Sequence, residues 1–185
     1  MDSQTLMIVV AVVVLLVVAA AAWMYYAKQS RARLRERFGP EYDRTVAAVG
    51  PDKAEAMLSE RANRVDHFKI RPLTKEQADA FSRDWLRVQG LFVDDPDAAV
   101  TEADRLLTQV MTARGYPLED FERRAEDISV DHPHVVENYR IAQSLVVKRQ
   151  RGMADTEELR QAIVNYRSLF DDLLEVKGRD YRRAS

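Results

Sequence analysis

The residues that most resemble a chemical site are Asp131, His132 and His134, with Glu137 one helical turn further along the chain. Carboxylates and imidazoles are ligands of zinc and of other divalent ions. A His-x-His pair supplies at most two imidazoles, however, and the remaining histidine, His67, is distant in sequence. Asp131 and His132 also stand at the start of a predicted helix, where such side chains cap backbone N–H groups. The pattern favours capping, and metal binding is the alternative.

No other pattern of residues indicates a catalytic or cofactor site. The six glycines are isolated, so neither a dinucleotide-binding nor a P-loop glycine motif is present. No Gly-x-Ser-x-Gly sequence occurs, and the absence of cysteine excludes thiolate nucleophiles and thiolate metal ligands. We therefore expect no cofactor and no enzymatic activity. Acid–base chemistry by carboxylates stays open, because such pairs are assembled in space and not in sequence.

Two clusters have a structural interpretation that is simpler than a functional one. Phe81, Trp85 and Phe92 recur at helical spacing, which is typical of a buried stripe and not of a ligand platform. The aspartates at 94, 95 and 97 lack the spacing, the glycine and the bidentate glutamate of a calcium loop. They precede a predicted helix, where the helix dipole favours carboxylates, so we expect them to act as caps.

The elements that would position these residues begin with an apolar segment. Residues 6–26 contain no charged side chain, and 21 residues of helix span about 30 Å, the thickness of the hydrocarbon core of a bilayer. The segment predicts a transmembrane helix, preceded by a short extracytoplasmic terminus at 1–5. The rings expected at the headgroup level are Trp23, Tyr25 and Tyr26. A cleaved signal peptide is the alternative, but no basic residue precedes the apolar segment.

Basic residues follow the apolar segment and predict its orientation. The five cations are Lys28, Arg31, Arg33, Arg35 and Arg37. The positive-inside rule places this flank in the cytoplasm, with the N-terminus outside. The cations can serve only as this topology signal, or they can also bind anionic lipid headgroups. The expected location is the inner or plasma membrane of a bacterium, crossed once.

The rest of the chain has the pattern of helices, so the predicted fold class is all-α. A basic juxtamembrane helical stalk is predicted over 27–70, with a break at Gly39-Pro40 and a second helix from about Pro51 to Lys69. An acidic compact bundle of about five helices, one of them short, is predicted over 71–176. A basic flexible tail is predicted over 177–185.

Helix boundaries within the bundle are predicted from local signals. A capping box is predicted at Thr74 to Gln77, and caps are predicted at Asp95, before Pro96, and at Asp155. Gly115 is expected to end one of the helices. A short helical segment is predicted from Tyr116-Pro117 through Leu118 and onward, and the next helix is predicted to open at Pro133. We expect Trp85 to pack against the last helix near Tyr166 and Phe170.

Composition narrows the class of partner. The net charge of the 185-residue chain is -2, which does not favour binding to nucleic acid. Hydrophobic residues make up 46% of the sequence, which excludes a disordered polyelectrolyte. The expected partners are the lipid bilayer and a protein that the sequence does not identify.

Several short peptides carry a resemblance. RFGPEYDR at 37–44, FVDDP at 92–96, RGYP at 114–117 and SVDHP at 129–133, followed by Tyr139-Arg140, resemble a family of uncharacterised bacterial single-pass membrane proteins. The similarity covers most of residues 31–175. It implies a bacterial inner or plasma membrane protein and implies no activity.

The expected function is a membrane-anchored helical protein-interaction module without catalysis. An acidic bundle on a basic stalk, with no recognisable active-site motif, supports this interpretation. The alternative is a membrane-tethered sensor that binds a metal or small ligand through residues 131–134.

Overall fold

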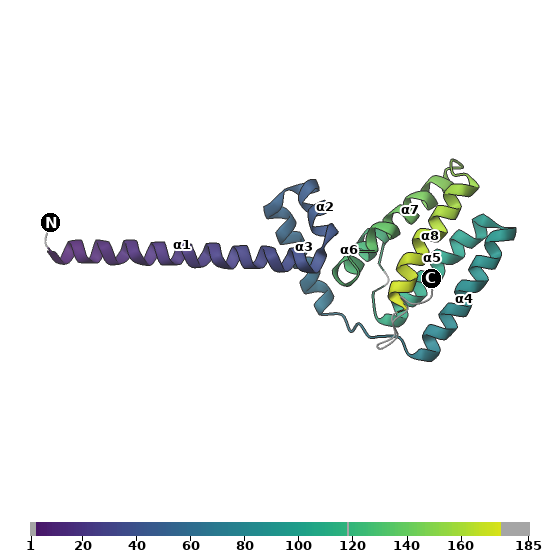
Figure 1. Cartoon of the computed structure of the whole chain (residues 1–185), viewed down its shortest axis with the longest axis horizontal. Helices are drawn as coiled ribbons and strands as arrows, with labels where there is room; N and C mark the ends of the chain where they lie inside the picture. Colours follow the sequence, from purple (N-terminus) through teal and green to yellow (C-terminus); the bar gives the residue numbers. More distant parts are fainter. Residues whose placement is uncertain (1–2, 118, 175–185) are drawn as a thin grey trace. The chain divides into compact units, whose positions relative to one another are not determined.

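The structure, a computed structural model, describes residues 3–117 and 119–174, without the side chains of residues 3–10, 23 and 27. The described part contains eight helices and no strand, as predicted for an all-α fold (Figure 1). The helices are α1 (Ser3–Phe38), α2 (Pro40–Val49), α3 (Pro51–Asp66), α4 (Lys75–Asp94), α5 (Pro96–Arg114), α6 (Phe121–Asp131), α7 (Val136–Gln150) and α8 (Thr156–Leu173). The chain divides into two compact units between Leu58 and Ser59.

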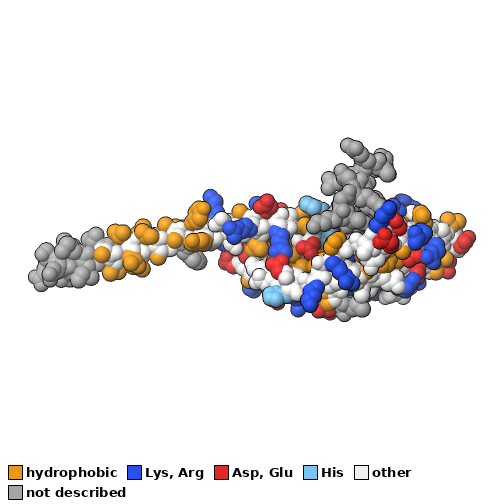
Figure 2. Space-filling view, turned by 90° about the horizontal axis from the view of Figure 1, so that it is seen from below, with side chains coloured by type: hydrophobic (Ala, Val, Ile, Leu, Met, Phe, Trp, Pro, Cys, Tyr) orange, Lys and Arg blue, Asp and Glu red, His pale blue; other side chains and the backbone are white. Residues whose placement is uncertain are grey.

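The first unit is dominated by α1, the one helix of the described chain that is long and apolar enough to cross a membrane. The described side chains at 11–22 and 24–26 are exposed, with Leu15 at 69% and Val17 at 63% (Figure 2). A row of exposed valines and leucines is costly in water. This length and composition fit the predicted transmembrane segment, although a signal sequence near an N-terminus shares both properties.

The C-terminal end of α1, which is predicted to face the cytoplasm, packs into a small cluster of helices. Leu34, Phe38, Ala54 and Leu58 are buried there. The predicted break after Phe38 is confirmed, because Gly39 has a φ of 47° and α2 starts at the next residue. The helix α2 itself was not predicted as a separate element, and its ten residues turn the chain back between α1 and α3.

The boundary between the two units differs from the stalk–bundle boundary predicted at 70/71. The second half of α3 belongs to the second unit. Arg61 donates to Glu126 at 3.2 Å, and Arg64 lies 2.7 Å from a carboxylate oxygen of Asp127 on α6. These ion pairs between residues more than 60 positions apart had no signal in the sequence. The predicted tail at 177–185 lies outside the described residues.

The second unit contains the predicted five-helix bundle, with α6 as its shortest helix. In the bundle α4 packs on α5, α5 on α8, α8 on α7, and α6 on α7 (Figure 1). The predicted caps are confirmed: Thr74 and Gln77 form a capping box, Asp95 accepts from the N–H of Ala98, and Gly115 ends α5 in the left-handed region. Asp155 forms a second capping box with Glu158.

Two helix starts differ from the predictions for a common reason. The short helix begins at Phe121 with Asp120 as its cap, and not at Pro117; Leu118 lies outside the described residues. The next helix begins at Val136, and not at Pro133. In each case a proline was taken as the first helical residue. Proline equally suits a turn, and here a few residues of turn separate it from the helix.

The core of the bundle includes the predicted aromatic packing. Trp85 of α4 is 2% exposed, and its ring stacks on Phe170 of α8 with 4.7 Å between centroids and 26° between planes. Stacking of Trp85 on the last helix was predicted and is confirmed. Tyr166, predicted as a second neighbour of Trp85, is tilted against Tyr139 of α7 at 6.2 Å. The aromatic stripes of α4, α7 and α8 thus share one core.

Candidate functional site

The predicted metal candidates sit at the turn between α6 and α7 and do not share a centre. His132 is 8% exposed. Its Nδ1 is hydrogen-bonded to Asp172 of α8, and its Nε2 lies 3.3 Å from Nη1 of Arg114. An arginine can only donate, so Nε2 accepts and the ring proton resides on Nδ1, which donates to the carboxylate. Both nitrogens that could hold a metal are therefore engaged in bonds that join α5, α6 and α8.

The neighbours of His132 point to other partners. Asp131 accepts a hydrogen bond of 3.0 Å from the hydroxyl of Tyr116, and burial, with the carboxylate nearby, raises the pKa of that hydroxyl. Glu137 pairs with Arg140 at 3.5 Å, and His134 is exposed. Within residues 3–117 and 119–174, no three His, Asp or Glu side chains are grouped as a metal ion needs. The predicted capping role is wrong, because Asp131 and His132 stand at the end of α6 and α7 begins after Val135 without a side-chain cap. Their side chains instead bond other side chains and tie helix ends together.

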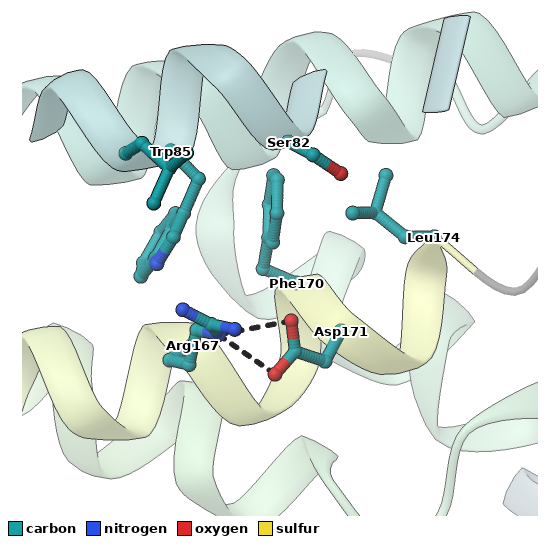
Figure 3. A pocket seen from close by; sticks show the side chains of 7 residues that line it. Ser82, Trp85, Arg167, Phe170, Asp171 and Leu174 are labelled. Atoms are coloured by element: carbon teal, nitrogen blue, oxygen red, sulfur yellow. Dashed lines mark hydrogen bonds and ion pairs between the residues drawn. The ribbon is translucent and has the colours of Figure 1, made fainter. Parts of the chain in front are cut away.

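A pocket lies elsewhere in the second unit, between α4 and α8 (Figure 3). Its volume is about 190 Å³. The helices α4 and α8 both pack on α5, and the pocket occupies the space that this leaves between their side chains. The lining residues are Ser82, Trp85, Leu86, Arg167, Phe170, Asp171 and Leu174. Four of these seven are apolar or aromatic, so the pocket combines an apolar surface with a few polar groups, as ligand sites do.

The polar side of the pocket is formed by α8. Arg167 donates from Nε to both carboxylate oxygens of Asp171, at 2.9 and 2.7 Å, and from Nη1 to Gln89 at 3.4 Å. Its guanidinium carbon lies 5.8 Å from the centre of the Trp85 ring, within range of a cation–π contact. The side chains of Arg167 and Asp171 remain about half exposed, at 44% and 50%. A charged pair thus stands at the solvent side of an aromatic surface.

The indole nitrogen of Trp85 is a buried donor without an acceptor in the part of the chain that the structure describes. Arg114 Nε, Arg124 Nε and the hydroxyl of Tyr139 share this condition. Trp85 is the one of these four residues that lines the pocket between α4 and α8. Figure 3 shows the nitrogen on the side of the ring that faces Arg167. Buried polar groups are nearly always hydrogen-bonded, so an unsatisfied donor beside a cavity calls for an explanation.

Two exposed apolar side chains lie on one face of α4, the first of them at the pocket. Leu86 at the pocket is 65% exposed, and Val93, seven residues on and on the same side of the helix, is 83% exposed. Single exposed apolar side chains are ordinary. Leu86 and Val93 together are called the apolar strip: two exposed side chains two helical turns apart on one face of α4, with Gln89 and Gly90 between them and Leu86 at the pocket.

The predicted membrane-interface residues lie along α1, and at least two of their cations form ion pairs within the first unit. Tyr25 and Tyr26 are exposed, and the side chain of Trp23 lies outside the described residues. Arg31 forms an ion pair of 2.8 Å with Glu55, and Arg35 one of 3.2 Å with Asp43. The other predicted cations are Lys28, Arg33 and Arg37, which are exposed. Part of the basic patch is therefore used inside the first unit.

Sequence reasoning placed Trp85 and Phe170 in the core but did not find the pocket. The available signal was weak: Arg167 and Asp171 have the i, i+4 spacing of an ordinary surface ion pair on a helix. Nothing in that spacing tells that the pair stands over an indole 82 residues away in the chain. Leu86 lies one residue off the predicted stripe of α4 and was not singled out.

Comparison of the chain with protein-family models, with curated proteins and with solved structures finds no match in any of the three.

Proposed function

We propose that this protein is a non-catalytic, membrane-anchored interaction module that binds a partner protein at the pocket between α4 and α8. The observation that carries the proposal is the apolar strip of Leu86 and Val93 beside that pocket. Exposed apolar strips on a polar surface favour contact with another protein. On the face drawn in Figure 2, acidic and basic side chains are intermingled, as on a solvated surface.

The anchor in this proposal is α1. It crosses a bacterial inner or plasma membrane once, with the N-terminus outside and the second unit in the cytoplasm. The uncharged apolar segment supports the anchor, and the cations that follow it support the orientation. Membership of the uncharacterised single-pass family suggested by the peptides at 37–44 and 129–133 belongs to the same proposal.

The alternative, a metal or small-ligand sensor at residues 131–134, has no observation in its favour. The ring nitrogens of His132 are bonded to Asp172 and Arg114, and Asp131 is bonded to Tyr116.

A photocrosslinking experiment in cells tests the interaction. A benzophenone amino acid replaces Leu86 in the full chain, and in a matched control it replaces Met153, which is apolar and 57% exposed at the turn between α7 and α8. We expect a discrete protein adduct from position 86 and none from position 153. Equal adducts from both positions, or none from position 86, would contradict the proposed interaction site.

The absence of native cysteine makes the topology testable with single-cysteine variants. Met153→Cys should react with a membrane-impermeant maleimide only after the membrane is permeabilised, and Ser3→Cys should react in intact spheroplasts. Labelling of Met153→Cys from outside would overturn the orientation. A purified chain that lacks residues 1–22 would show instead that the segment is a cleaved signal peptide.

A further inference from the structure

The pocket between α4 and α8 presents two donors to one region. The indole N–H of Trp85 has no acceptor within the described residues, and it faces the guanidinium of Arg167. Nε and Nη1 of Arg167 are engaged by Asp171 and Gln89, and among the described residues no hydrogen bond uses the protons of Nη2. A neutral donor and a cationic donor side by side fit an anionic acceptor with two oxygens, and a carboxylate has that chemistry.

The other side of the pocket suits an apolar group. Phe170 and Leu174 are buried at 1% and 4%, and Leu86 stands exposed at the rim. A cavity of about 150 Å³ holds a benzene ring. The volume here, about 190 Å³, therefore suits one aliphatic or aromatic side chain.

We propose that this pocket binds the C-terminal residue of a partner polypeptide, with an apolar side chain against Phe170 and Leu86 and a free carboxylate on Trp85 Nε1 and Arg167. The inference rests on the proposed interaction function and specifies what the pocket recognises. Capture of a terminal carboxylate is a recurrent mode of peptide recognition. A polypeptide is favoured over a small free acid because the strip of Leu86 and Val93 supplies surface for the residues that lead into the pocket.

The charges around Arg167 allow its guanidinium to bind the carboxylate of such a ligand. The indole nitrogen has no accessible surface, so side chains of the pocket have to shift before an oxygen can reach it. Both side chains of the Arg167–Asp171 ion pair are about half exposed, and exposed ion pairs contribute little to the free energy of folding. The guanidinium can therefore reorient at small cost. Asp171 is then a competitor for Arg167 and a source of repulsion for the incoming carboxylate.

The test measures binding of fluorescein-labelled pentapeptides to the full-length protein in phosphatidylcholine nanodiscs by fluorescence anisotropy. The peptides end in Leu or Phe with a free carboxylate, in the same residues with an amide, or in Lys. We expect the free acids ending in Leu or Phe to bind at least about tenfold more tightly than the amides, because hydrogen bonds to a charged group are the strong ones.

Four variants locate the contact. Trp85→Phe keeps the aromatic surface and removes the N–H, and Arg167→Gln removes the cation; each should weaken binding of the free acid about tenfold and leave the amide unchanged. Arg160→Gln is the matched control, since Arg160 forms a similar exposed pair with Glu157 on the same helix and does not line the pocket. Asp171→Asn should tighten binding of the free acid about threefold, because the competing carboxylate is gone.

The outcomes separate this inference from the function on which it rests. If the amides bind as well as the acids, if Arg167→Gln has no more effect than Arg160→Gln, or if none of the peptides binds, recognition of a terminal carboxylate is wrong. Weaker binding of a Lys-ending peptide to Asp171→Asn, with no preference for acids, would identify a cationic ligand and overturn it as well. Adducts from position 86 in cells would still support the interaction module in each of these cases.

Discussion

Two arginine–carboxylate clusters on α8 differ in how completely the protein itself uses them. At the C-terminal end of α8, Asp172 bonds His132, whose second nitrogen accepts from Arg114. One residue earlier, Asp171 bonds Arg167 above Trp85. The first cluster centres on a buried histidine, has its aspartate 35% exposed and joins the ends of three helices. The second is about half exposed, adjoins a cavity and leaves an indole N–H without an acceptor among the described residues. Residue types that could bind a metal or act in catalysis therefore need not mark the binding site.

The largest effect is expected where the pocket and the core share a residue. Trp85→Ala removes the ring that stacks on Phe170 and should lower the free energy of unfolding by ~3–5 kcal/mol, through lost transfer energy and a cavity. A domain has only ~5–15 kcal/mol in total, so the variant should be marginal or unfolded. Helical circular dichroism on heating measures the loss. A melting curve like that of the unmodified protein would remove Trp85 from the core.

The His132 cluster should affect stability more than the Arg167 cluster does. His132→Ala removes a buried ring and leaves the part-buried Asp172 and Arg114 without their shared partner, and should cost about 1–3 kcal/mol. The control is His134→Ala, which changes an exposed histidine two residues away and should stay within about 0.5 kcal/mol. Thermal or urea unfolding of the two variants makes the comparison. Similar stabilities for both would reduce the His132 cluster to a surface feature.

Substitution of Arg167 should have the opposite consequences, with a small effect on the free energy of unfolding and a large effect on peptide binding. Arg167→Gln breaks an exposed ion pair and should cost at most ~1 kcal/mol. The same urea unfolding experiment measures it. A loss as large as that of His132→Ala would mean that Arg167 holds the bundle together, and the contrast between the two clusters would disappear.

The smallest effect on stability is expected at the rim. Leu86→Asn replaces an apolar side chain that is 65% exposed and should change the free energy of unfolding by no more than about 0.5 kcal/mol. With a benzophenone amino acid at Val93, which lies further along the same face, the substitution should abolish adducts with the partner. Full adduct formation in the Leu86→Asn background would place the interaction elsewhere on the surface.

The fold was largely predictable because its signals are local. A capping box at Thr74, proline after Asp95 and glycine at 115 define helix ends within four residues of sequence, and the structure has them where predicted. The helix α2 was missed because Gly39-Pro40 indicates only a break and does not show that a separate short helix begins there. The compact units divide after Leu58, whereas the stalk–bundle boundary predicted from composition lies at 70/71. The pairing of Arg64 with Asp127 has no local pattern in the sequence.

The candidate site was less predictable, because it depends on contacts between residues that are far apart in the sequence. Stacking of Trp85 on the last helix could be inferred from two aromatic stripes that each need a partner. The pocket depends on how α4 and α8 pack on α5. Whether the indole N–H has an acceptor among the described residues depends on the orientation of the Trp85 ring. At 131–134 the sequence showed the right residue types, but it could not show that Asp172 and Arg114 occupy the ring of His132.

The most direct test of the account observes the indole N–H of Trp85 itself. In the full-length Trp23→Phe variant, Trp85 is the only tryptophan, so ¹⁵N-tryptophan labelling gives one indole signal in a nanodisc sample. Addition of a pentapeptide ending in Leu with a free carboxylate should move this signal downfield as the N–H gains an acceptor. The amidated peptide should leave it in place. An indole signal that does not respond to the free acid at concentrations where the anisotropy measurement shows binding would contradict the account.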